Sequence, residues 1–140
     1  MTAEEIILVR ASWTKISQNA DAVALMFYDR LFELDPAARP LFATSNLIEQ
    51  RRKLVRALAM VVQGLHHLET LIPTLADLGR RHAQFGVTEA QYASVGAALL
   101  WTLEQALGPQ WTPAVKVAWA SAYAALARVM KDAAGTSRRS

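Results

Sequence analysis

One short segment constrains the fold of this chain more than any other, because it places a histidine on the apolar face of a helix. Pro73 suits the first position of a helix, and Gly86 suits the residue just beyond its end. The residues between them that share one face, spaced by three and four, are Leu75, Leu78, His82 and Phe85. We therefore expect a short helix from Pro73, with the imidazole of His82 pointing into the protein.

Two interpretations of His82 remain open on this pattern alone. In the first, it is a core histidine whose ring bonds a backbone carbonyl, as buried polar groups usually do. In the second, it is the only side-chain ligand of a metal held among apolar residues. Haem iron suits the second interpretation, because the porphyrin supplies four ligands and the protein needs to supply only one.

The rest of the chain repeats the helical spacing, and no segment shows strand alternation between hairpin turns. The predicted helix starts, each with a capping residue or proline, are at Thr2, Asp35-Pro36, Asn46, Thr88 and Thr112-Pro113. We expect the helix from Asn46 to run to about Leu68. The predicted fold class is all-α, with six substantial helices and two short ones.

Two further polar residues lie on predicted apolar stripes, and each has two interpretations. Tyr28 shares a stripe with Leu25 and Phe32, so it is either an ordinary core tyrosine or an inward hydroxyl that needs a partner. Gln50 begins the apolar stripe that continues through Leu54. It is either a boundary residue half in water or a placed hydrogen-bond donor. The two other histidines of the chain, His66 and His67, point away from this stripe and are expected at the surface.

The length of 140 residues predicts one domain, over residues 1–134, followed by a flexible polar tail at 135–140. A net charge of +3 with scattered basic residues does not indicate binding to nucleic acid or membranes. There are no cysteines, which excludes disulfides and thiolate metal sites. The sequence shows no signal peptide and no membrane-spanning run, so we expect a cytoplasmic protein. No large apolar patch is marked, so a monomer is the default.

A set of motifs, taken together, resembles the globin family over about residues 4–133. These motifs are Trp13, Phe27-Tyr28 with Leu31-Phe32, Asp35-Pro36, Leu41-Phe42, Gln50 with Leu54, Leu78-Gly79-Arg-Arg-His82, Tyr92, and Ala118-Trp119 with Tyr123. Within the family, the chain is most similar to bacterial single-domain globins and to the haem domains of flavohaemoglobins. The stretches 78–87 and 107–119 also resemble neuroglobins. The resemblance implies a globin fold around a haem pocket.

The resemblance also implies roles for individual residues around haem b. His82 is implied as the proximal ligand of the iron, and Phe42 as the side chain that packs on the haem face. Tyr28 and Gln50 match the distal tyrosine and glutamine of bacterial globins. The further implied haem contacts are Leu54, Leu78, Val87 and Val95, with Lys53 and Arg81 near a propionate and Tyr92 close to His82 on the proximal side.

Two departures from the family patterns change the expected chemistry. Neuroglobins carry a distal histidine that binds iron, whereas Gln50 occupies that position here and is a poor iron ligand. Flavohaemoglobins place a glutamate behind the proximal histidine and carry a reductase domain. The last predicted helix offers no clear matching glutamate, and no reductase sequence follows. We therefore expect weaker electronic push behind His82 and electrons from a separate reductase.

The expected function is reversible, high-affinity binding of O2, with Tyr28 and Gln50 donating hydrogen bonds to the gas. CO and NO are the other diatomic ligands implied. The alternative is a nitric oxide dioxygenase that uses a separate reductase, so whether the protein is an enzyme stays open. A third possibility is a sensor or haem-free helical module that acts through a partner.

Overall fold

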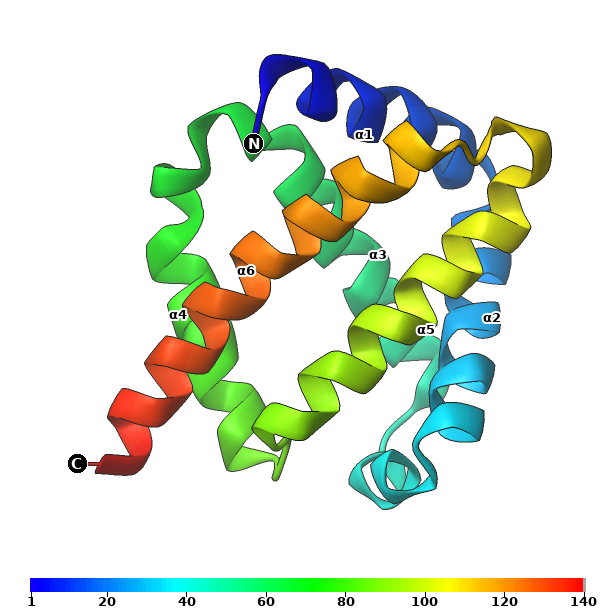
Figure 1. The fold of residues 1–140 in the computed structure, drawn as a ribbon. Coiled ribbons are helices and arrows are strands. Elements are labelled where there is room, and N and C mark those ends of the chain that lie inside the picture. Colours follow the sequence, from blue (N-terminus) through cyan, green and yellow to red (C-terminus); the bar gives the residue numbers. More distant parts are fainter. Residues whose placement is uncertain (140) are drawn as a thin grey trace.

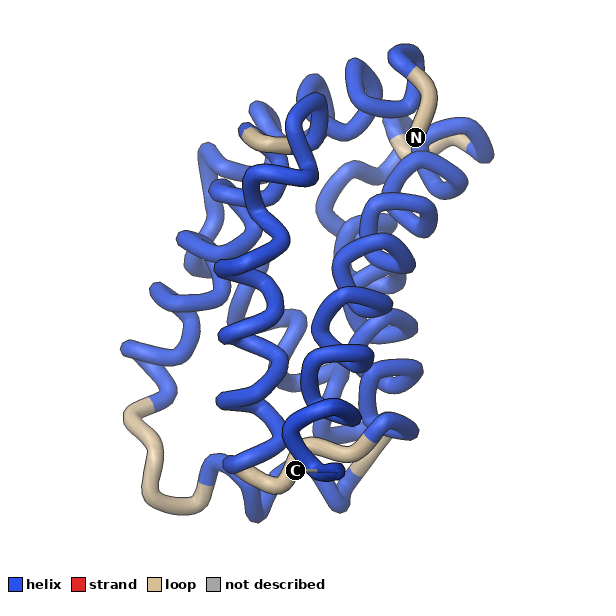
Figure 2. The backbone as a smooth tube through the Cα atoms, turned by 90° about the vertical axis from the view of Figure 1, so that its left-hand side faces the viewer, coloured by secondary structure: helices blue, strands red, loops and turns tan. Residues whose placement is uncertain are grey.

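The computed structural model describes the backbone of residues 1–139 and the side chains of residues 1–135. Its α-helices are α1 (Ala3–Ile16), α2 (Ala20–Leu34), α3 (Leu47–Gln63), α4 (Leu68–Gln84), α5 (Glu89–Leu107) and α6 (Pro113–Arg139). Short 3₁₀ segments between them are η1 (Ser17–Asn19), η2 (Pro36–Phe42), η3 (Leu65–His67) and η4 (Gly108–Gln110). Over this part of the chain every regular element is helical, which confirms the all-α prediction (Figure 2).

At three of the predicted helix starts, the expected side chain caps the helix. The Thr2 hydroxyl accepts from the Glu5 N–H at 3.1 Å, and the Glu5 carboxylate accepts from the Thr2 N–H at 2.9 Å. Asn46 Oδ1 accepts from two backbone N–H groups of the first turn of α3. Thr112 Oγ1 accepts from the Val115 N–H at 3.2 Å. These bonds satisfy donors that a helix start leaves without an internal partner. By contrast, the side chain of Asp35 makes no capping bond.

The predicted boundaries between the third and fourth helices are wrong. α3 ends at Gln63 rather than near Leu68, and α4 already begins at Leu68, so Pro73 lies inside α4. α3 ends where Gly64 follows it as the C-cap residue, and Leu71 packs closely over this glycine, since a Cβ there would stand 2.7 Å from Leu71 Cδ1. Pro73 is the sixth residue of α4, so it does not mark the helix start that its preference for a first turn predicted.

Two apolar residues expected to point inward are exposed instead. Leu25 is 45% exposed, because the buried stripe of α2 runs through Ala24, Phe27, Tyr28 and Leu31. Phe85 is 67% exposed and is the residue that follows the end of α4 at Gln84. His66 and His67 are exposed as predicted.

α6 packs against three other helices, α1, α4 and α5 (Figure 1). α4 lies along α6, α1 crosses near the start of α6, and α2 packs along α5. Trp119 on α6 donates its indole N–H to Ser12 Oγ on α1 at 2.8 Å.

None of the helices within residues 1–139 has both the length and the apolar character needed to span a membrane. α6 continues to Arg139, past the start of the predicted polar tail at Gly135, and Ser140 lies outside the described residues. The flexibility expected of this tail stays a prediction.

Candidate functional site

Tyr28 on α2 is the centre of one side of the site. Its side chain is buried, with 9% of its surface exposed. Its ring packs edge-on against Phe42 of η2, with ring centroids 5.5 Å apart, and lies 6.1 Å from the ring of Phe32. Its hydroxyl lies 3.5 Å from the backbone carbonyl oxygen of Gln50, which is longer than a typical O–H···O bond. The structure therefore brings together Tyr28, Phe42 and the backbone of Gln50, and the hydroxyl of Tyr28 makes only a long contact.

Burial fixes the charge state of the Tyr28 hydroxyl. Loss of solvent disfavours a phenolate and raises the pKa of Tyr28 to about 12. At physiological pH the group is therefore a neutral phenol with an O–H to donate.

The first turns of α3 complete this side of the site. Gln50 and Leu54 are half-buried, and Leu54 packs against the hydrophobic core. The neighbouring Arg51 donates from Nε to Asp21 Oδ1 on α2 at 3.0 Å. This ion pair ties the start of α3 to α2, so Gln50 is held near the helix that carries Tyr28.

His82 lies near the end of α4, where two backbone hydrogen bonds define the turn that follows. The Val87 N–H donates to the His82 carbonyl at 3.0 Å, and the Gly86 N–H donates to the Ala83 carbonyl at 3.0 Å. These two bonds form a Schellman motif, in which the residue after the helix adopts a positive φ. Gly86 has a φ of +96°, as the predicted glycine stop requires. Val87 is therefore joined directly to the backbone of His82.

The surroundings of His82 favour the neutral imidazole. Burial lowers the pKa of His82, and the positive charge of Arg81 lowers it further. A neutral ring keeps a nitrogen lone pair, which is the form that binds a metal. Among residues 1–135, no cluster of three or more His, Asp or Glu side chains could hold a metal ion. A single imidazole is the protein ligand that haem iron needs, because the porphyrin supplies four others.

A close backbone contact fixes the helix that carries His82. A Cβ built on Gly79, one turn before His82, would stand 2.6 Å from Met130 Cα and would also collide with the Met130 carbonyl oxygen. Only a glycine lets α4 approach the main chain of α6 this closely. This role of Gly79 was not predicted, although a glycine inside a helical pattern is the signal for such an approach.

The residue before Phe42 also lies next to the turn that follows His82. A Cβ on Gly86 would lie 3.4 Å from Leu41 Cδ2, so the residues before Phe42 and Val87 are neighbours. The predicted apolar contacts of the cofactor are half-buried side chains packed against the core, namely Phe42, Leu54, Leu78, Val87 and Val95. These side chains therefore keep apolar surface that a cofactor could cover. With one neutral imidazole and a buried phenol donor also present, the donor set fits haem.

The two predicted propionate contacts are both at the surface. Lys53 is exposed. Arg81 is exposed and pairs with Asp77 on the previous turn, with Arg81 Nε 3.0 Å from Asp77 Oδ2. Their role toward a propionate stays a prediction.

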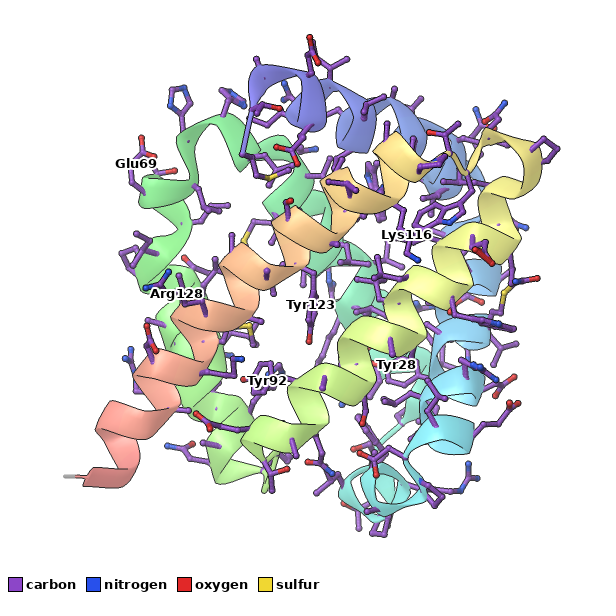
Figure 3. All side chains as sticks on the ribbon, in the orientation of Figure 1. Tyr28, Glu69, Tyr92, Lys116, Tyr123 and Arg128 are labelled. Atoms are coloured by element: carbon purple, nitrogen blue, oxygen red, sulfur yellow. The ribbon has the colours of Figure 1, made fainter. Side chains whose placement is uncertain are left out.

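Tyr92 is buried in the first turn of α5. Its carbonyl oxygen accepts a hydrogen bond from the Tyr123 hydroxyl of α6 at 2.6 Å. In Figure 3, Tyr123 points from α6 toward the start of α5, where Tyr92 lies, while Tyr28 lies on the far side of α5. Tyr123 is part of one of the globin-like motifs, and no role was predicted for it.

Comparison with known proteins agrees with this geometry. The globin family model matches residues 25–130. The chain is 32% identical to a neuroglobin of Danio rerio, over 88% of this chain and 86% of that protein. It is 31% identical to the anaerobic nitrite reductase NSHB5 of Oryza sativa subsp. indica, over 94% and 92% of the two chains.

Solved structures show the same fold. A bacterial globin from Campylobacter jejuni superposes with a TM-score of 0.88 at 24% identity, covering 99% of this chain and 100% of that one. A hexacoordinated haem protein from an anhydrobiotic tardigrade gives a TM-score of 0.85 at 17% identity, covering 96% and 95%. The family model, the relatives and the arrangement of helices agree, and the chain belongs to the globin family of haem-binding proteins.

Proposed function

We propose that this globin binds O2 reversibly with high affinity, and that the Tyr28 hydroxyl is the main source of that affinity. The observation that carries the proposal is the buried phenol of Tyr28, whose hydroxyl lies at the long distance of 3.5 Å from the backbone carbonyl oxygen of Gln50. A neutral, desolvated donor held this loosely is available to a ligand in the same space.

Ferrous haem, when bound, supplies reversible binding of diatomic gases and shifts negative charge onto O2. The chain supplies the donor that meets this charge. A hydrogen bond to a charged group contributes roughly 1.5–3 kcal/mol, so the phenol would tighten O2 binding by about 10- to 100-fold. CO acquires less charge as a ligand and should gain less from the same donor.

Gln50 and the apolar side chains around it support the same function. Gln50 is half-buried and its backbone carbonyl lies beside the phenol, so we propose its side-chain amide as a second donor. Phe42, Leu54 and Val95 are half-buried apolar groups that limit the access of water and protons to the site. Slow oxidation of the ferrous protein is the expected consequence.

Replacement of Tyr28 by Phe tests the proposal, because it removes the donor and keeps the ring. We expect the O2 dissociation rate, measured by stopped-flow displacement with CO, to rise by about 10-fold or more. The CO dissociation rate of the same variant is the internal control and should change much less. An unchanged O2 dissociation rate would contradict the proposal.

Reaction with nitrogen oxides is a second candidate function, because the rice relative is named as an anaerobic nitrite reductase. Nitric oxide dioxygenation, the oxidation of NO by bound O2 to nitrate, is a different reaction with a nitrogen oxide, and its repeated turnover needs electrons from a reductase. Anaerobic mixing of the ferrous protein with nitrite, and aerobic mixing with NO, would measure the two single reactions. Many turnovers with a cellular reductase would be needed to support an enzymatic role.

A further inference from the structure

An ion pair joins α2 to α3 beside the half of the site that contains Tyr28. Arg51 Nε donates to Asp21 Oδ1 at 3.0 Å, and Arg51 Nη2 lies 3.5 Å from Asp21 Oδ2. The two residues are 30 positions apart in the chain. Two nitrogens of one guanidinium therefore face the two oxygens of one carboxylate, an arrangement that fixes orientation as well as distance.

The two partners of this pair differ in their exposure to solvent. The side chain of Arg51 is 17% exposed, whereas that of Asp21 is 67% exposed. Arginine side chains are mostly exposed in proteins, so the low value means that protein covers most of Arg51. Water around the carboxylate weakens the attraction, and dissolved salt screens it further. The free energy of the pair should therefore depend on ionic strength.

The first turn of α3 has little apolar burial to hold it in place. Leu47 is 37% exposed and Ile48 is 52% exposed. The capping bonds from Asn46 join neighbouring residues and do not attach the turn to another helix. Leu54, in the second turn, packs against the hydrophobic core. The segment that contains Gln50 thus lies between an exposed first turn and the packed part of the helix.

The contacts of this segment with α2 have unequal strength. The Tyr28 hydroxyl lies 3.5 Å from the Gln50 carbonyl oxygen, a distance at which a hydrogen bond is weak. The Arg51–Asp21 contact is shorter and joins two charged groups, so it is the stronger of the two. Arg51 directly follows Gln50 in the chain. Opening of the ion pair would therefore allow the backbone of Gln50 to move away from Tyr28.

We propose that Arg51 and Asp21 are positioning residues that hold the start of α3 against α2 and thereby slow the release of a bound gas. When the pair opens, the backbone of Gln50 separates from Tyr28, and gas leaves more easily. High ionic strength favours the open form. The effect on O2 release rests on the proposed function, whereas the movement of α3 does not.

Replacement of Asp21 by Asn tests the movement of α3, with Glu49→Gln as the matched control. Both residues are acids in the first turn of a helix, and each pairs with an arginine of α3. Only Asp21 reaches α3 from another helix, because Glu49 pairs with Arg52 of its own helix at 2.9 Å. We expect amide hydrogen exchange at the start of α3 to become about two- to fivefold faster in Asp21→Asn. The CO stretching band of the ferrous CO form should shift as well. Glu49→Gln should leave both unchanged.

The salt dependence of O2 release tests the consequence for function. We expect the O2 dissociation rate of the wild type to rise by about two- to fivefold between about 0.05 M and 1 M NaCl. In Asp21→Asn the rate should already be high at low salt and should change little. Arg51→Met should behave as Asp21→Asn does, and the double variant should add nothing further, because each single change already removes the pair.

Asp21→Asn carries the test if Arg51→Met does not fold, since Asp21 is exposed. Wild-type exchange and a wild-type CO band in Asp21→Asn would overturn the proposal, and so would equal changes in Glu49→Gln. A salt response as large in Asp21→Asn as in the wild type would also contradict it. Failure of the proposed function is a separate result, an unchanged O2 dissociation rate in Tyr28→Phe, and hydrogen exchange at α3 does not depend on it.

Discussion

The three histidines of this chain differ in their surroundings, and only one of them has a partly buried ring. His66 and His67 lie in η3 at the surface, with ring centroids 4.4 Å apart. His82 is half-buried, and its lowered pKa keeps a lone pair on the ring. Spacing alone was enough to predict this distinction, because helical periodicity places side chains on faces.

Replacement of His82 by Ala should abolish stable haem binding, because no other side chain assigned to the site is a good iron ligand. The Soret absorbance per protein, measured after gel filtration, would fall to a small fraction of the wild-type value. His67→Ala is the matched control and should retain full haem content. Equal haem content in the two variants would contradict the assignment of His82.

The helices themselves were predictable where local chemistry decides them. Thr2, Asn46 and Thr112 cap as their sequence contexts predict, and Gly86 ends α4 with a positive φ. The boundary between α3 and α4 was predicted wrongly, because α3 already ends before Gly64 and Pro73 lies inside α4 instead of at its start.

For the candidate site, too, some features could be predicted from the sequence and others could not. The residue types and faces of Tyr28, Gln50 and His82 followed from periodicity, and their roles followed from the resemblance to globins. The contacts that hold them in place did not follow, since the Arg51–Asp21 pair and the Tyr123 bond join segments far apart in the chain. Distances between such segments come only from the packed structure.

Gly79→Ala should destabilise the protein, because the new Cβ would meet the main chain of Met130. Overpacking of this kind typically destabilises by about 1–3 kcal/mol, more than alanine gains in helix propensity. Denaturant titration would measure the free energy of unfolding, and haem affinity should fall with it. Gly135→Ala is the control, since nothing lies within 4 Å of its Cβ. A stability equal to wild type in Gly79→Ala would show that the two helices can separate without penalty.

At the scale of the whole molecule, buried tyrosines make stability sensitive to alkali. Burial raises the pKa of Tyr28 to about 12 and raises that of Tyr123 as well. An unfolded tyrosine ionises near pH 10, so above that pH the unfolded chain holds fewer protons than the folded one. Stability is therefore complete below about pH 10 and is lost as the pH rises through the pKa of the folded state.

The melting temperature of the ferrous CO form should accordingly fall steeply between about pH 10 and pH 12. The contribution of Tyr28 is on the order of 2–3 kcal/mol at full loss. In Tyr28→Phe the fall should be shallower, because phenylalanine has no proton to release. Calorimetry across this range would make the comparison, and parallel curves for the two proteins would refute the argument.

The main-chain approach at Gly79 also limits how the protein can be redesigned. Met130 contributes its Cα and carbonyl oxygen, so exchanging its side chain creates no room for a larger residue at position 79. Relief would require displacement of α6, which also carries Trp119 and Tyr123 and their bonds to α1 and α5. A saturation library selected for red, haem-loaded colonies should therefore return glycine at position 79 while tolerating several side chains at position 130.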